Sequence, residues 1–196
     1  MAKNRMNMRE RTLWVTRTAI FTALLLMGQF ATAPLGNQYV TGSIVNMVLI
    51  VSVLVCGMAT GITVAVVSPV CAILLGLGPA AAFPLLLPFI MAGNIVFVLA
   101  WFAFSRFGRW RNTQPAGQGY RILFYATPAL AALAKFLALY TGVVLVAVPY
   151  VLGLAEGQSA VVSLMFSYPQ LITAAIGGAL ALAVMPPLRK ALKLAQ

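Results

Sequence analysis

Long hydrophobic stretches, separated by short polar or glycine- and proline-rich connections, dominate the sequence. A helix needs about 20 mainly apolar residues to cross a hydrocarbon core of about 30 Å. Measured against this length, the pattern predicts six membrane-spanning helices. They cover approximately residues 13–33, 43–58, 61–77, 83–104, 122–151 and 160–185. The predicted fold is therefore an all-α integral membrane protein, with a six-transmembrane-helix bundle over residues 13–185.

Three features of this pattern affect the boundaries. The second and third spans are short and are divided only by the connection from Cys56 to Gly61. The fifth is longer than a crossing requires, so either its helix tilts or it begins only at Pro128, where a first-turn proline is tolerated. The first resembles a signal peptide, but its apolar run is too long and Pro34 follows the apparent cleavage site. We therefore predict a retained helix.

Composition supports a membrane protein and excludes most catalysis. Hydrophobic residues make up 62% of the 196 and charged residues only 8%, whereas a soluble domain needs more polar surface. Histidine is absent, and the only carboxylates are those of Glu10 and Glu156. These residues offer no acid–base pair, catalytic triad or metal cluster. We predict that the protein is not an enzyme, has no catalytic residues, and uses no metal or cofactor.

The basic residues predict the orientation. They form three clusters, in a basic N-terminus (residues 1–12), between the fourth and fifth spans, and in a basic C-terminus (residues 186–196), which does not indicate a nucleic-acid partner. With six spans and a cytoplasmic N-terminus, eleven of the thirteen lysines and arginines lie on the cytoplasmic side. The other two, Arg17 and Lys135, lie within spans. We predict a multi-pass protein of a bacterial-type plasma membrane, with both termini cytoplasmic.

The three tryptophans fall near the predicted cytoplasmic ends of the spans. Tryptophan is enriched where a bilayer meets water, so Trp14, Trp101 and Trp110 are interpreted as interface anchors.

Polar side chains from several spans lie in the outer half of the predicted bundle. Counted by helical rise, Asn46 lies about 6 Å below the outer surface, and Asn94 and Lys135 about 16–18 Å. In the last span, Ser163, Ser167 and Gln170 follow an i, i+4, i+7 pattern that predicts one shared face. Amides in lipid need polar partners. Interhelical hydrogen bonds would supply these, and so would a solvated ligand pocket open to the exterior and capped by the loop 34–42.

Lys135 stands alone in an apolar helix. Neither Glu10, near the N-terminus, nor Glu156, in a predicted outer loop, is placed to pair with it. A buried cation is costly unless it is paired. Three interpretations remain open: a carboxylate-bearing ligand pairs with the lysine, the side chain reaches the cytoplasmic interface or backbone carbonyls, or the amine is buried in its neutral form.

Ala19 and Ala23 in the first span are small residues four positions apart. Such spacing lets membrane helices approach closely, either inside the bundle or at a docking face for another membrane protein. With six spans, a basic N-terminus and this alanine motif, the chain resembles the substrate-binding S component of an energy-coupling factor (ECF) vitamin transporter. Further similar segments are residues 40–46 (VTGSIVN), 68–70 (SPV), 75–78 (LGLG) and 88–94 (PFIMAGN).

The resemblance implies a division of labour. The chain would capture a vitamin or related micronutrient outside, while a separate membrane coupling (T) protein and two cytoplasmic ATPases drive its release inside. The lack of a phosphate-binding glycine–lysine loop agrees with separate ATPases. By the same resemblance, Ala19 and Ala23 contact the coupling protein. Together with Asn46 from the polar pattern, the implied substrate-binding residues are Asn37, Gln38, Tyr39, Asn94, Lys135, Ser167 and Gln170.

Two other functions fit the composition. One is a small scaffolding protein of an envelope complex, which a co-purifying ATPase or a retained small molecule would argue against. The other is a self-sufficient small transporter, which the lack of an internal repeat between the two halves disfavours.

Overall fold

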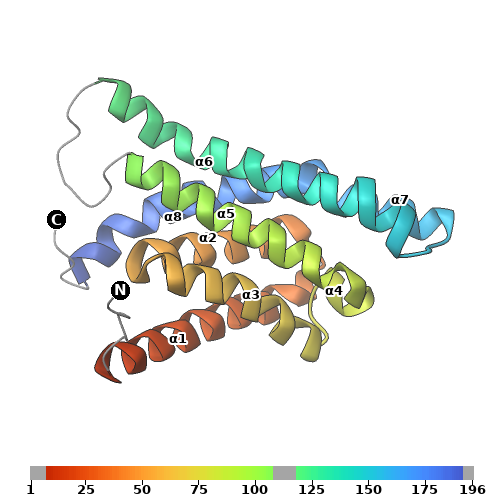
Figure 1. Cartoon of the computed structure of the whole chain (residues 1–196), viewed down its shortest axis with the longest axis horizontal. Coiled ribbons are helices and arrows are strands. Elements are labelled where there is room, and N and C mark those ends of the chain that lie inside the picture. The colour runs from red at the N-terminus through yellow and green to blue at the C-terminus, as the bar shows by residue number, and fades with distance from the viewer. Residues whose placement is uncertain (1–7, 108–117, 192–196) are drawn as a thin grey trace, which may run out of the picture.

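A computed structural model describes residues 8–107 and 118–191, and over these ranges the fold is all-α. The long helices run antiparallel to their chain neighbours, and the start of α1 lies at the same end of the bundle as the end of α8 (Figure 1). The elements in chain order are α1 (Met8–Thr32), η1 (Ala33–Leu35), α2 (Gln38–Cys56), α3 (Met58–Leu74), α4 (Pro79–Ala82), η2 (Pro84–Leu86), α5 (Leu87–Phe107), α6 (Gln118–Leu139), η3 (Tyr140–Val151), α7 (Glu156–Met165) and α8 (Tyr168–Ala191). Of the predicted basic N-terminus (residues 1–12) and C-terminus (residues 186–196), residues 1–7 and 192–196 lie outside the described residues, as does the loop 108–117.

Five helical segments of the described chain are long and apolar enough to cross a membrane. They are Met8–Leu35, Gln38–Cys56, Pro84–Ser105, Ala126–Val151 and Glu156–Ala191. The prediction of an all-α, multi-pass membrane protein is thereby confirmed. The third predicted span corresponds to α3, an apolar helix of only 17 residues. At 1.5 Å per residue it covers about 26 Å, a little less than a hydrocarbon core.

Large apolar side chains are exposed on the outside of the bundle. Phe30 is 70% exposed, Leu74 80% and Leu137 50%, and each lies on a different helix. Soluble proteins rarely carry so much exposed apolar surface, whereas lipid tails provide an apolar environment for it. The exposed side chains therefore agree with the hydropathy of the helices.

Glycine sets the boundary between the second and third helices. Gly57 has φ of 90° and ψ of 175°, a conformation that essentially only glycine adopts without strain. The chain can therefore reverse between Cys56 and Met58.

The fifth predicted span begins earlier than Pro128, because α6 starts at Gln118 and contains Pro128 in its interior. The interpretation that this helix begins at Pro128 is wrong. Beyond Leu139 the helix continues as η3, a π-helix of 12 residues.

The last predicted span is divided into α7 and α8. Pro169 is the second residue of α8; it has no backbone N–H to donate, and it disfavours helical geometry in the residue before it. In the connection, Ser167 donates its hydroxyl to the backbone oxygen of Ser163 at 2.7 Å. Ser163 thus belongs to α7, Ser167 to the connection and Gln170 to α8. The prediction that these three residues share one continuous helical face is wrong.

Much of the core lies among α2, α5 and α8. Trp101 is fully buried there, so its interpretation as an interface anchor is wrong, while Trp110 lies outside the described residues.

Gly177 allows α8 to approach α2 closely. A Cβ atom at this position would lie 2.6 Å from the Cβ of Asn46 and 2.8 Å from the backbone oxygen of Ser43. The contact fixes the part of α2 that carries Asn46.

Candidate functional site

A cavity of about 430 Å³ lies within the bundle. Its walls come from α1, α2, α3, α5, α6, the end of α7, the start of α8 and the connection between these two, with further residues from η1 and from the start of α4 and the segment before it. In Figure 1, η1 and α4 lie at the end of the bundle opposite the start of α1 and the end of α8. Pockets that enclose small organic molecules have volumes of roughly 300–1,000 Å³. The cavity is therefore large enough for a metabolite.

Lys135 lies in the cavity wall at the meeting point of three helices. Its Nζ donates to Oδ1 of Asn46 at 2.6 Å and to Oδ1 of Asn94 at 2.9 Å. The side chain is only 4% exposed, and Nζ also lies 5.1 Å from the centre of the Phe97 ring. Because both acceptors are amides inside the bundle, the interpretation that Lys135 reaches the cytoplasmic interface is wrong. The other two interpretations of this lysine stay open.

Two glycines near the amides allow close packing of α5 on α6 and of α8 on α2. A Cβ at Gly93 would lie 2.5 Å from Cδ2 of Leu139, one helical turn after Lys135. The missing side chain lets α5 and α6 approach where Asn94 and Lys135 meet. Gly177 does the same for α2 and α8, and the Nδ2 group of Asn46 donates to the Thr173 hydroxyl of α8 at 3.4 Å. The amide oxygen of Asn46 is thereby left to face Lys135.

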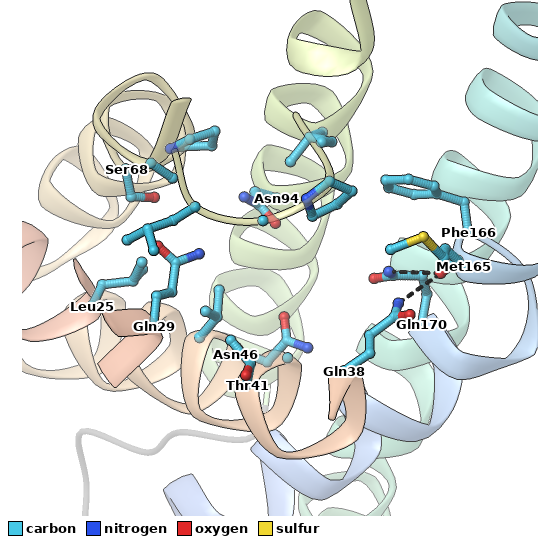
Figure 2. Close-up of a pocket in the computed structure, with 18 of the residues that line it drawn as sticks. Leu25, Gln29, Gln38, Thr41, Asn46, Ser68, Asn94, Met165, Phe166 and Gln170 are labelled. Atoms are coloured by element: carbon cyan, nitrogen blue, oxygen red, sulfur yellow. Dashed lines mark hydrogen bonds between the residues drawn. The ribbon is translucent and has the colours of Figure 1, made fainter. Parts of the chain in front are cut away.

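A second polar group is built around the end of α7. Gln38 of α2 and Gln170 of α8 both donate through Nε2 to the backbone oxygen of Met165, at 2.8 Å and 3.0 Å. This carbonyl belongs to the last turn of α7, where helical partners are missing. Figure 2 shows the two amides converging on Met165, while Asn46 and Asn94 project into the space from α2 and α5. Since both glutamines use their NH₂ groups for Met165, their oxygens remain available as acceptors.

Most of the residues predicted to bind substrate line this one cavity. They are Asn37, Gln38, Asn46, Asn94, Lys135 and Gln170. Tyr39 is not among the lining residues and is 38% exposed. Ser167 is also not among them, because its hydroxyl turns back to α7. Asn37 has a structural role as well, since its side chain accepts from the backbone N–H of Tyr39 and caps α2. Whether any of these residues binds a ligand stays a prediction.

The cavity lining also includes polar and aromatic residues that the candidate set lacks, among them Gln29, Thr41, Ser68 and Phe166. Gln29 and Ser68 carry a signal in the sequence, because each is a polar residue inside an apolar stretch. Thr41 and Phe166 carry none, since threonine and phenylalanine are ordinary in membrane helices. Their position depends on the turn at η1 and on the break before α8, which only the fold reveals.

The predicted docking motif lies on a different surface. Ala19 and Ala23 are exposed on α1 and line an apolar hollow of about 420 Å³, together with Thr18, Thr22 and Val67. Val67 belongs to α3, so the hollow lies where α1 meets α3. The two alanines are therefore outside the intramolecular packing of the described residues. Contact with another protein stays a prediction.

The described residues also contain no group of three or more histidine, cysteine or acidic side chains arranged to hold a metal ion. Comparisons with protein-family models, curated proteins and solved structures find no match to this chain. The observations thus converge on a multi-pass membrane protein with an internal polar cavity.

Proposed function

We propose that the protein is the substrate-capture subunit of an ECF-type ATP-driven importer, which binds a vitamin or related micronutrient from outside the cell. The observation that carries this proposal is the cavity of about 430 Å³, whose polar lining is gathered from nearly every long helix. Membrane helices usually bury polar groups inside a bundle only where those groups find partners or mark a substrate pathway. A scaffolding protein has no need for such a cavity.

The proposed orientation follows from the basic clusters and from the position of the cavity. Both chain ends and the loop between α5 and α6 face the cytoplasm under the positive-inside rule, and α3 completes the set of six crossings. The cavity, at the opposite end of the bundle, then lies on the external side. This arrangement suits a protein that takes its substrate from outside.

The sequence has no phosphate-binding glycine–lysine loop, so in an ATP-driven importer ATP hydrolysis belongs to separate subunits. We propose that a membrane coupling protein docks on α1 at the hollow lined by Ala19 and Ala23, and that two cytoplasmic ATPases drive release. The exposed small side chains support this, because they allow a partner helix to approach the α1 backbone closely.

Gentle purification of the full chain from its own cells tests the proposal. The expected result is co-purification of a membrane protein and two ATPases, together with a retained small molecule identified by mass spectrometry. Ala19→Leu combined with Ala23→Leu fills the hollow and should reduce the recovered ATPases at least tenfold. The matched control is Ala103→Leu, since Ala103 is exposed on α5 and does not line the hollow. Recovery of the protein without ATPases and without a small molecule would favour the scaffolding alternative.

A further inference from the structure

We infer that the cavity selects a small carboxylate whose other end carries hydrogen-bond donors such as hydroxyl or amide N–H groups. This inference rests on the proposed function and adds the chemical class of the substrate. Three features carry it: a cation without an acidic partner, an unused donor on that cation, and a set of acceptors elsewhere in the cavity.

In its protonated form Lys135 has no counter-charge among the described residues. Its two acceptors, on Asn46 and Asn94, are uncharged amide oxygens. The two acidic residues of the chain, Glu10 in the first turn of α1 and Glu156 in the first turn of α7, do not line the cavity. A charge held away from water is costly unless an opposite charge accompanies it. A bound carboxylate supplies that opposite charge, whereas a cationic ligand would add repulsion.

The lysine also has a hydrogen-bond donor left to offer. A protonated amine has three N–H groups, and two of them are directed to Asn46 and Asn94. Among the described residues no third acceptor lies within hydrogen-bonding distance of Nζ, and Lys135 is part of the cavity lining. The two amides hold the long side chain in place, so a ligand oxygen meets a donor whose position is already fixed. Such preorganisation lowers the entropic cost of binding.

The rest of the cavity presents acceptors rather than cations. Gln38 and Gln170 commit their NH₂ groups to Met165 and keep their oxygens, and in Figure 2 the oxygen of Gln170 lies on the side that faces Asn94. Oε1 of Gln29 is buried and has no partner among the described residues. Buried acceptors of this kind are satisfied by donors on a ligand. Lys135 is the only lysine or arginine among the lining residues that the structure describes.

The walls between these polar groups are apolar. Leu25, Ile90, Leu139 and Phe166 line the cavity, so the body of the ligand is expected to be a short hydrocarbon chain or a small ring. The selected molecule is therefore amphipathic in a defined order: an anionic end, an apolar body, and hydroxyl or N–H groups remote from the anion.

Asn94→Asp provides the sharpest test, because it places the missing acid beside Lys135 with almost no change in shape. An internal carboxylate pairs with the lysine and excludes a second one from the ligand. The wild-type protein, Asn94→Asp, Lys135→Met and the control Lys190→Met are immobilised and incubated with a deproteinised extract of the cells that express the protein. Lys190 is exposed in the last turn of α8 and is not a cavity residue, so the control removes the same charge elsewhere. Bound compounds are identified by mass spectrometry.

The expected result is one carboxylate enriched on the wild-type protein and on Lys190→Met, and reduced at least tenfold on both cavity variants. Its methyl ester should bind the wild-type protein at least tenfold more weakly. The ester comparison decides the matter if a variant fails to give a monodisperse preparation. A neutral or cationic bound compound overturns the inference, as does equal binding to Asn94→Asp or no enrichment on any protein. Co-purification of the ATPases, measured separately, shows in each case whether the proposed function stands.

Discussion

Gly177→Ala tests how rigidly α8 holds α2 and, through it, the lysine site. The new Cβ would lie 2.6 Å from the Cβ of Asn46, 2.8 Å from the backbone oxygen of Ser43 and 3.0 Å from the backbone nitrogen of Met47. Two of these atoms belong to the backbone and cannot rotate away, so the helices must separate. Overpacking of this kind costs about 1–3 kcal/mol, partly offset by about 0.5–1 kcal/mol because alanine favours a helix more than glycine does.

A net loss of about 1 kcal/mol corresponds to a fall of roughly 2–4 °C in the unfolding midpoint for a chain of this size. Thermal unfolding in mild detergent, followed by intrinsic fluorescence and by the monodisperse peak in size-exclusion chromatography, measures it. Binding of the retained small molecule should fall as well, because Asn46 moves away from Lys135. Gly157→Ala is the matched control, since a Cβ added at Gly157 meets no neighbouring atom within 4 Å. If Gly177→Ala unfolds at the same temperature as Gly157→Ala, the close approach of α2 and α8 does not constrain the bundle.

Two further predictions concern the other polar and packing contacts. Gly93→Ala should destabilise less than Gly177→Ala, because its Cβ meets Cδ2 and Cγ of Leu139, at 2.5 Å and 2.6 Å, which belong to a side chain that can rotate rather than to a backbone; an equal or larger fall in the same unfolding assay would contradict this. Gln38→Leu should cost about 0.5–1.5 kcal/mol through the lost hydrogen bond to Met165. Adding Gln170→Leu should cost more than the sum of the two single changes, because the Met165 oxygen then has neither donor, and simple additivity in a double-mutant cycle would refute that coupling.

Hydrophobic length and charge were sufficient to predict the helices but not how each one ends. Runs of apolar residues translate directly into helices because a bilayer leaves the backbone few other ways to satisfy its hydrogen bonds. The polar pattern gives no sign of the break before α8, since Ser163, Ser167 and Gln170 fit a helical period even though Pro169 interrupts it. Trp101 was misassigned for a related reason: the same side chain suits a lipid interface and a packed core, and only the neighbouring helices distinguish the two.

The sequence predicts the candidate site best at polar and charged residues whose burial in lipid is costly. Asn46, Asn94 and Lys135 are costly in lipid, and the structure places both amide oxygens within 2.9 Å of the lysine Nζ. Their mutual contact was not predicted, because it depends on Gly93 and Gly177, which allow the helices to close. A glycine in an apolar segment does not indicate which helix will pack against it.

The π-helix η3 affects how α7 is oriented relative to α6. Buried residues recur every fourth position from Ala131 through Lys135, Leu139 and Val143 to Ala147. In an α-helix, residues four positions apart are rotated by about 40° around the helix axis. Buried residues that recur every fourth position would therefore turn progressively away from the bundle. Each turn of a π-helix holds more than four residues, so these residues turn back in the opposite sense. The second half of this helix therefore keeps the buried residues facing the bundle. A one-residue deletion within η3 would rotate α7, and with it the Met165 carbonyl, relative to Lys135.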